Sequence, residues 1–221
     1  MSSMYETIME LPLFKGIGEE QLSHMLEKTC VNFKKYEGGE EIAKARDNVK
    51  NVDFILSGKV KVLYKMSHYP VEVEEILGKG SILGARHLFG MDTTYCGDLL
   101  AMTKVSLMRI DKSEYMNILQ SDRIYMLNYV NYISAALQRC PSYLMESDDD
   151  PISRALILLG LSMTSRMAEM IKLKASKTAF ATYCGVEDKE FLQWESRMSG
   201  LHRFQISEEG ILINPRPIPS L

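Results

Sequence analysis

The stretch Ile76–Met102, ILGKGSILGARHLFGMDTTYCGDLLAM, predicts two strands separated by a short buried turn of helix. Glycines interrupt its apolar residues, and a polar loop at residues 90–94 leads into the second strand. Because glycine tolerates positive φ and close backbone approach, such a loop can direct several backbone N–H groups at a small ligand. Two interpretations stay open on these residues alone, a ligand-binding loop and an ordinary turn-rich corner of a barrel.

The composition of the 221-residue chain is that of a globular protein, with 46% hydrophobic and 25% charged residues. This length allows one large domain or two small ones. No apolar run approaches the roughly 20 residues of a membrane helix, and residues 1–14 lack the basic region and cleavage site of a signal peptide. We therefore expect a cytoplasmic protein without a membrane partner.

The four cysteines stand far apart, without the spacing of a zinc or iron–sulfur site, and are expected to be buried and reduced. The net charge of −3 argues against a chain that coats nucleic acid non-specifically. Charge is nevertheless uneven, because the residues from Pro151 onward carry +2 and the remainder carries −5. The sequence shows no nucleophile–base pair, so an enzyme is not expected.

The order of apolar residues predicts two kinds of structure in the first two thirds of the chain. Residues 5–26 have the pattern of a short helix, a turn and a second helix. From Cys30 the period changes to two, which predicts short antiparallel strands and hence a small barrel or roll. A three- and four-residue period then predicts a long amphipathic helix over about residues 112–139, with a break at Ser121-Asp122.

A hinge is predicted at residues 140–150, because Pro141 cannot continue a helix without losing a hydrogen bond. Asp150 can cap the next helix with Pro151 at its first position, and a second domain starts there. In that domain, helices at 176–183 and 188–198 are joined at a glycine, and a hairpin turns at 208–210. This order is typical of a winged helix, which in proteins serves either DNA binding or structure alone.

With these segments in place, the chain resembles the Crp/Fnr family of bacterial transcription regulators over nearly its whole length. The similar segments are LPLFKGIGEEQL (11–22), VDFILSGKVKVLYK (52–65), ILGKGSILGARHLF (76–89), CGV (184–186) and EEGILI (208–213), and FILSGKVKV is a specific motif. The resemblance implies an α+β protein. An antiparallel, jelly-roll-like β-roll of the cyclic-nucleotide-binding type with a long dimerisation helix would fill residues 1–145, and a C-terminal winged helix-turn-helix DNA-binding domain would fill residues 146–221.

The effector pocket implied by the resemblance departs from the family pattern. Family members that bind cyclic AMP resemble GELxLF followed at a fixed distance by RSA, in which the glutamate contacts the ribose and the arginine contacts the phosphate. The corresponding positions here are Ala85, Tyr95 and Cys96. Loss of a charge-assisted bond to a buried phosphate forfeits about 1.5–3 kcal/mol, so cyclic AMP is not expected. The expected pocket residues are Gly84, Ala85, Arg86, His87, Tyr95, Cys96 and Arg139.

Arg86 and His87 lie in one turn and together could receive an anion. His87 could also ligate haem iron, as a histidine does in some haem-sensing relatives. The alternative is that Arg86 is solvated and His87 is a satisfied, partly buried histidine. The family's iron–sulfur branch is excluded, because its N-terminal cysteine cluster is absent from the sequence.

The predicted recognition helix also departs from the family. Family members resemble SRETVSR after the turn glycine, whereas this chain reads EDKEFLQ at residues 187–193, with an aspartate in place of the first arginine and a lysine in place of the glutamate. Lys189 and Gln193 lie one helical turn apart and are expected to reach base edges, with phosphate contacts from nearby bases. The expected DNA-binding residues are Lys177, Asp188, Lys189, Gln193, Arg197 and Arg203.

The leading hypothesis is a homodimeric regulator that binds double-stranded DNA, an unidentified small-molecule effector and RNA polymerase. Dimerisation is expected through the apolar row Leu127, Val130, Ile133 and Leu137, which one chain would struggle to cover. The alternative is a ligand-binding or protein-interaction module whose winged helix no longer binds DNA. The acidic residues Glu187, Asp188 and Glu190 favour this alternative.

Overall fold

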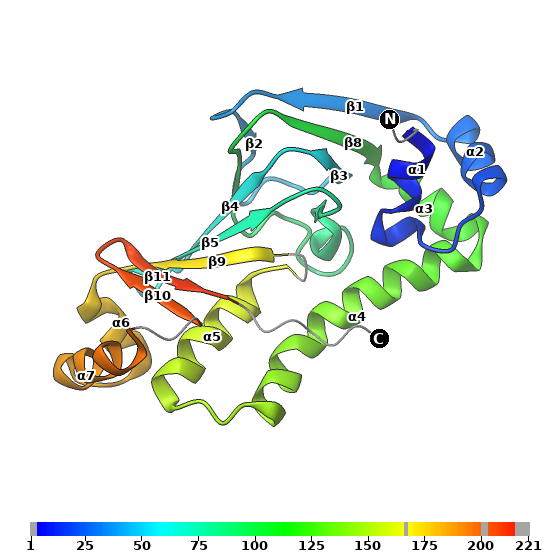
Figure 1. Ribbon diagram of the computed structural model, residues 1–221. Coiled ribbons are helices and arrows are strands. Elements are labelled where there is room, and N and C mark those ends of the chain that lie inside the picture. Colours follow the sequence, from blue (N-terminus) through cyan, green and yellow to red (C-terminus); the bar gives the residue numbers. More distant parts are fainter. Residues whose placement is uncertain (1–3, 166–167, 200–202, 215–221) are drawn as a thin grey trace. The chain divides into compact units, whose positions relative to one another are not determined.

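Figure 1 shows the computed structural model of the chain, in which residues 4–165, 168–199 and 203–214 are described. The chain divides into two units. Unit 1 comprises Met1–Lys61 and Leu77–Ala136, and unit 2 comprises Val62–Ile76 and Leu137–Leu221. None of the described helices is long and apolar enough to cross a membrane.

Unit 1 begins with the predicted helix, turn and helix. The segments are α1 (Met4–Met9), a 3-10 turn η1 (Pro12–Phe14) and α2 (Glu19–Lys28). The second helix starts at Gly18, whose N–H donates to the side-chain oxygen of Gln21 at 3.1 Å. Leu22 and Met25 are buried on one face of α2, as the helical spacing predicts.

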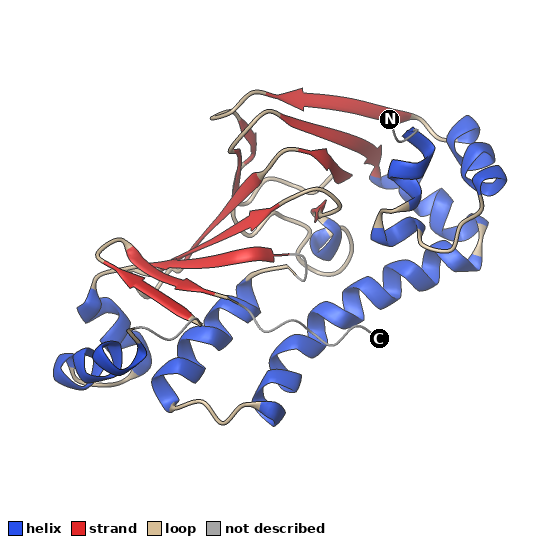
Figure 2. Ribbon diagram, viewed as in Figure 1, coloured by secondary structure: helices blue, strands red, loops and turns tan. Residues whose placement is uncertain are grey.

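The strands of unit 1 form the core of a β-roll. An antiparallel sheet of four strands has the order β1 (Val31–Tyr36), β8 (Val105–Asp111), β3 (Asn51–Ser57) and β6 (Ile82–Leu83). A second antiparallel pair joins β2 (Glu41–Ala43) to β7 (Asp98–Ala101). Figure 2 shows β1 and β8 as long neighbouring strands, and the central strand β3 carries a continuous buried run.

The turn that follows β3 requires glycine. Gly58 has a φ of 90°, and a Cβ added to it would lie 2.3 Å from the carbonyl oxygen of Lys104. Both the backbone conformation and the close approach exclude a side chain at this position. The motif FILSGKVKV thus contains its glycine for a steric reason, and β4 (Val60–Lys65) follows with buried Val60, Val62 and Tyr64 in the predicted alternation.

Two helices complete unit 1 and lead out of it. Asp111 caps α3 (Lys112–Ser121), and α4 (Arg123–Glu146) begins after a break at Asp122, as predicted. The carboxylate of Asp122 accepts a bond from the N–H of Ile124 at 2.9 Å and so starts the new helix. The side chain of Asn128 donates to the carbonyl oxygens of Leu13 and Lys15, which ties α4 to the N-terminal turn.

The predicted end of this helix at residue 139 is wrong, because α4 continues through Pro141 to Glu146. The residues on either side of the proline are held by their side chains. Arg139 is buried and donates to the carbonyl oxygens of Thr164 and Ser165. Tyr143 is buried as well, and its hydroxyl donates to Asp149. These contacts compensate for the one backbone hydrogen bond that Pro141 cannot make.

Unit 2 contains α5 (Pro151–Met163), capped by Asp150 as predicted, and then β9 (Ala168–Lys174). Helices α6 (Lys177–Cys184) and α7 (Asp188–Met198) follow, joined at Gly185, whose φ is 70°. The hairpin of β10 (Phe204–Ser207) and β11 (Gly210–Ile213) turns at the predicted residues. Within unit 2 the strand order is β10, β11, β9, β5 (Glu72–Leu77) and β4.

The core of unit 2 is aromatic. Phe191 contacts both Phe180 and Trp194, and Trp194 contacts Phe204. Trp194 is fully buried, and its indole N–H donates to the hydroxyl of Ser153 at 2.8 Å, so its polar atom has a partner. This cluster fixes one face of α7 and leaves the opposite face exposed.

The units differ in composition from the predicted division into residues 1–145 and 146–221. Residues 62–76 group with the C-terminal part of the chain, and the boundary between the two units falls within α4, after Ala136. Buried Glu75 illustrates this grouping. Its carboxylate accepts from the hydroxyl of Tyr64 at 2.7 Å and from the N–H of Ser165 at 2.6 Å. The boundary of independently folding domains stays a prediction.

Candidate functional site

The loop after β6 is built on a left-handed glycine. Gly84 has a φ of 77°, and a Cβ there would lie 2.8 Å from the Cγ1 atom of Val49 and 3.3 Å from the ring of Tyr95. The chain then makes one 3-10 turn, η2 (Ala85–His87). Gly84 is therefore needed both for its conformation and for the close packing of two neighbouring segments.

Five of the predicted pocket residues surround this turn. Ala85 is buried, and Arg86 and His87 are half-buried. Tyr95 is buried beside Gly84, and burial raises the pKa of its phenol. Its backbone is fixed by two hydrogen bonds, one to Asp47 at 2.9 Å and one from Arg46 at 2.8 Å. Gly84, Ala85, Arg86, His87 and Tyr95 are thus neighbours within unit 1.

Cys96 completes the group through a contact that sequence spacing does not reveal. Its Sγ lies 3.3 Å from Nε2 of His87. Both Cys96 and Cys30 are exposed, so the expectation of buried thiols is wrong for these two residues. Burial lowers the pKa of His87, and the charge of Arg86 lowers it further, while Asp92 acts in the opposite direction. The imidazole is therefore neutral at neutral pH and can accept a proton.

A buried ion pair that sequence reasoning missed lies in the same unit. Asp53 is 1% exposed, and both of its carboxylate oxygens accept from the guanidinium of Arg109 at 2.7 Å. The two residues face each other in the register of β3 and β8, which a strand alignment could have revealed. Asp53 also raises the pKa of Tyr95, after burial. Breaking a bidentate pair of this kind is costly, because the loss of one partner leaves the other as an unpaired buried charge.

The turn η2 is linked directly to helix α4. The hydroxyl of Tyr129 donates to the carbonyl oxygen of Ala85 at 3.0 Å. The same ring contacts Phe89 and Tyr115 edge to face, with centroids 5.7 and 6.0 Å apart. A movement of the turn would therefore act on α4 through one hydrogen bond and a set of aromatic contacts.

Comparison with known proteins finds a domain model that is similar to part of the chain. Residues 33–122 match the cyclic nucleotide-binding domain family. The matched range begins within β1 and covers the other strands of unit 1, the strands β4 and β5, the turn η2 and α3. Among proteins with curated descriptions, none is similar enough in sequence to count as a match.

Solved structures show the same fold as this cyclic nucleotide-binding domain. The catabolite activator protein of Thermus thermophilus has 15% identity and a TM-score of 0.54, covering 92% of this chain and 94% of its own. The sensor domain of the transcriptional regulator DNR from Pseudomonas aeruginosa has 16% identity and a TM-score of 0.51, covering 66% of this chain and 99% of its own. At these identities the similarity establishes the fold alone.

Arg139, the remaining predicted pocket residue, belongs to unit 2. Its guanidinium donates to the carbonyl oxygens of Thr164 and Ser165 and contacts the hydroxyl of Thr164. These partners give Arg139 a role in holding the end of α4, and its place in an effector pocket of the cyclic nucleotide-binding domain stays a prediction.

Haem does not fit the residues around His87. Nε2 of the ring, a nitrogen that could ligate iron, already contacts Cys96, and the adjoining side chains of Ala85 and Leu88 are buried. Within residues 4–165, 168–199 and 203–214, no group of three or more His, Cys, Asp and Glu side chains could hold a metal ion.

The predicted DNA-binding residues fall into two classes by their surroundings. Lys189, Gln193 and Arg197 are exposed on α7. Two others have partners within unit 2, since Lys177 pairs with Glu195 at 2.8 Å and Asp188 accepts from the hydroxyl of Thr178 at 3.1 Å. The helix α7 thus presents basic and amide side chains on the face opposite its aromatic core.

Arg203 has a partner that the sequence did not indicate. Its Nη1 donates to both carboxylate oxygens of Asp149, at 2.6 and 2.7 Å, and the guanidinium lies over the ring of Tyr143 at 5.6 Å. The arginine side chain is only 20% exposed. A phosphate contact by Arg203 would require this ion pair to open, and its DNA-binding role stays a prediction.

The side chains of the predicted dimerisation row are largely exposed to solvent in the single chain. Leu127, Val130 and Leu137 are 54%, 48% and 74% exposed, and Ile133 is half-buried. Large apolar side chains on one helix face are the usual mark of a surface that another chain covers.

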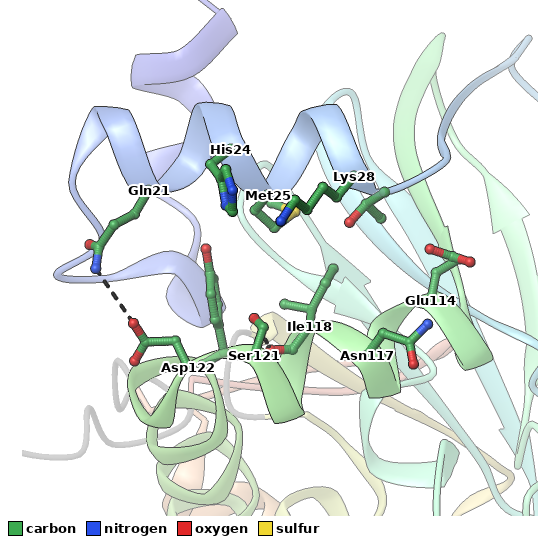
Figure 3. Close-up of a pocket in the computed structure, with 11 residues that line it drawn as sticks. Gln21, His24, Met25, Lys28, Glu114, Asn117, Ile118, Ser121 and Asp122 are labelled. Carbon is green, nitrogen blue, oxygen red and sulfur yellow. Dashed lines mark hydrogen bonds between the residues drawn. The ribbon is translucent and has the colours of Figure 1, made fainter.

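Two cavities of unit 1 lie outside the predicted pocket. Figure 3 shows one of about 280 Å³ between α2 and α3, at one end of which the side-chain amide of Gln21 donates to Asp122 at 3.4 Å. The other, of about 570 Å³, is lined by residues that include Phe89, Thr93 and Lys112. None of the predicted effector residues lines either cavity.

Proposed function

We propose that the protein is a one-component transcription regulator of the Crp/Fnr type, in which the cyclic nucleotide-binding domain senses a small molecule and the C-terminal part binds double-stranded DNA as a winged helix. The observation that carries this proposal is the exposed face of α7, where Lys189 and Gln193 project away from the buried Phe191 and Trp194. Lysine suits guanine and glutamine suits adenine in the major groove.

The arrangement around α7 supports the proposal. Helices α6 and α7 are joined at a left-handed glycine, and the hairpin of β10 and β11 follows them, which is the order of elements in a winged helix-turn-helix. Arg197 is exposed in the last turn of α7, where it can contact phosphate. The regulator would act as a homodimer that reads a palindromic site and contacts RNA polymerase.

The effector is proposed to be a small molecule other than cyclic AMP. Ala85 is buried where the resemblance expects a ribose-binding glutamate, and Tyr95 is buried where it expects a phosphate-binding arginine. Neither side chain can replace a charge-assisted hydrogen bond. Calorimetry with cyclic AMP should show no heat of binding, and a dissociation constant in the low micromolar range would contradict this part of the proposal.

A second candidate function is a ligand-binding module that does not bind DNA. It is favoured by the three acidic residues Glu187, Asp188 and Glu190, which are exposed at the start of α7 and would repel phosphate. The two candidates agree on the sensory domain and differ in whether the full-length protein binds a duplex.

Selection of bound sequences from a random duplex pool distinguishes the two candidates. At about 50 mM salt the wild-type protein should enrich a palindromic site. The logarithm of its affinity should fall linearly with the logarithm of the salt concentration, with a slope of about 0.9 per neutralised phosphate. The selection is done with and without cell extract to supply the effector. Absence of enrichment under both conditions would favour the module without DNA binding.

Single substitutions then test the assigned roles. Lys189→Ala should change the preferred sequence, because a base contact is lost, whereas Arg197→Ala should weaken binding to all sequences alike. Lys34→Ala is the matched control, since Lys34 is an exposed lysine on β1 in unit 1 and its loss changes the net charge equally. If Lys34→Ala and Lys189→Ala have the same effect, Lys189 contacts no base.

A further inference from the structure

Cys96 and His87 form a nucleophile–base pair in the cyclic nucleotide-binding domain. His87 ends the turn η2, and Cys96 lies just before β7, so the loop between them brings the two side chains together. The 3.3 Å distance between Sγ and Nε2 is within hydrogen-bonding range for sulfur. Such a pair is the arrangement by which proteins activate a thiol.

The surroundings of the pair favour a reactive thiol. Cys96 is exposed, so a small solute can reach its sulfur. Burial and the neighbouring charge of Arg86 lower the pKa of His87, so the ring is neutral and its Nε2 can accept from the thiol, while Asp92 favours the protonated ring that proton transfer forms. The charged groups that act on His87 are thus Arg86 and Asp92.

The other cysteines lack this arrangement. Cys30 is exposed like Cys96, but in the described part of the chain no histidine contacts it. Cys140 and Cys184 are half-buried, and burial raises the pKa of the Cys184 thiol to about 11. Cys30 is therefore a matched control within the same chain, because both cysteines are exposed but Cys96 contacts a histidine.

We propose that Cys96 is a modification site, a thiol activated by His87 that hydroperoxides oxidise. Nε2 of His87 takes the thiol proton, and the thiolate sulfur attacks one oxygen of hydrogen peroxide. The S–O bond forms as the O–O bond breaks, and the leaving hydroxide takes the proton from His87 to give water. The sulfur is oxidised by two electrons to a sulfenic acid, and peroxide is reduced.

The modified sulfur would contact the turn η2, which is linked to helix α4. His87 follows Ala85 and Arg86 in η2, and the carbonyl oxygen of Ala85 accepts the bond from Tyr129. Oxidation adds an oxygen to the sulfur that contacts His87, and so changes a contact of the turn η2. The site is defined by unit 1 alone and stands whether or not the protein binds DNA.

The first experiment measures the rate of thiol alkylation residue by residue. The full-length protein is treated with iodoacetamide at pH 7, and peptide mass spectrometry follows the four cysteines separately. Cys96 should react about tenfold faster than Cys30 or more, because the thiolate is the nucleophile. Equal rates at Cys96 and Cys30 would overturn the proposal.

The second experiment tests the role of His87. His87→Ala should slow alkylation of Cys96 about tenfold and leave Cys30 unchanged, and added imidazole should restore the rate. His24→Ala is the matched control, since His24 is exposed on α2 in the same unit. If circular dichroism shows that His87→Ala is unfolded, His87→Gln is used instead. An unchanged rate at Cys96 in a folded variant would overturn the proposal.

The third experiment tests the oxidation itself. The protein is treated with hydrogen peroxide in the presence of dimedone, which traps sulfenic acids. The adduct should form at Cys96 in preference to Cys30, and His87→Ala should reduce it about tenfold, in parallel with alkylation. Trapping at Cys30 to the same extent, or at neither residue, would contradict the assignment of a peroxide-reactive thiol.

Discussion

The phenol of Tyr125 is a buried polar group whose capacity to form hydrogen bonds is unused. The residue is 4% exposed, and its hydroxyl has no partner in the described part of the chain. Burial raises the pKa of the phenol, and the charge of Asp122 raises it further. A buried hydroxyl without a partner lowers stability by the cost of its desolvation.

Tyr125→Phe should therefore leave stability unchanged or raise it by about 1 kcal/mol, measured by urea denaturation. Tyr129→Phe is the matched control, because the Tyr129 hydroxyl does donate to Ala85, and its loss should cost about 1 kcal/mol. A loss of more than about 1 kcal/mol in Tyr125→Phe would mean that the hydroxyl has a partner in solution.

The acid stability of the protein can be traced to another single residue, Asp149. Burial opposes its ionisation, but hydrogen bonds from Ser147, Tyr143 and Arg203 outweigh burial and hold its pKa below the usual value. Because the folded-state pKa is lowered, the stabilisation is fully present above the unfolded-state value near 4, and it is lost as pH falls through the folded-state value.

Asp149→Asn should therefore reduce stability near neutral pH and flatten its dependence on pH below about 4. Asp148→Asn, a change at the exposed neighbour, is the matched control, and its stability should depend on pH in the same way as that of the wild type. Thermal denaturation at several pH values measures both. Parallel profiles for the wild type and Asp149→Asn would show that this carboxylate does not contribute to acid stability.

At the scale of elements, α4 shows how tertiary contacts override a local helix signal. The sequence pattern around Pro141 predicts that the helix ends there. The helix continues, because the buried side chains of Arg139 and Tyr143 hold it on both sides of the proline. Pro151, in contrast, occupies the first position of α5, where its missing N–H costs nothing. The same residue type therefore has opposite consequences at two positions in one unit.

Pro141→Ala should stabilise the protein by about 1–3 kcal/mol, because an interior backbone hydrogen bond becomes available. Pro151→Ala is the matched control and should lower stability slightly, since it increases the freedom of the unfolded chain without adding a bond. Denaturant unfolding checks both. If the two variants shift in the same direction, the backbone account of Pro141 is incorrect.

The elements themselves followed from local patterns. Glycines, caps and apolar periods predicted α2, the break at Asp122, the start of α5 and the hairpin of β10 and β11. The edge strand β1 did not follow its pattern. Phe33 is 49% exposed although it alternates with Val31, because an edge strand is not obliged to bury one face.

The candidate site was predictable only in part. The turn residues 84–87 could be found because glycines and a motif lie together in the sequence. The contact of His87 with Cys96 and the ion pair of Asp53 with Arg109 depend on long-range pairing, which spacing along the chain does not encode. The partner of Arg203 was missed for the same reason, as Asp149 is 54 residues away, and its DNA contact stays a prediction.

At the scale of the whole molecule, the exposed row on α4 bears on assembly. An apolar row of this kind costs hydration free energy in a monomer, and a second copy offers the same row in return. The row is exposed at Leu127, Val130 and Leu137, which together extend over several turns of the helix.

The double variant Val130→Asp and Ile133→Asp should therefore sediment as a monomer where the wild type sediments as a dimer. Met91→Asp with Met102→Asp is the matched control, because these methionines are 107% and 45% exposed and lie outside α4. A wild-type protein that is monomeric at micromolar concentration would show the idea to be wrong.

The glycine after β3 also limits how this chain can change over generations. At Gly58 any added carbon would overlap the carbonyl oxygen of Lys104, at 2.3 Å, whereas Gly39 has no atom within 4 Å of that position. In a population of gene copies that accumulates random substitutions, the codon for residue 58 would remain a glycine codon wherever the roll still folds. The codon for residue 39 would drift more freely, restricted by its φ of 91° alone.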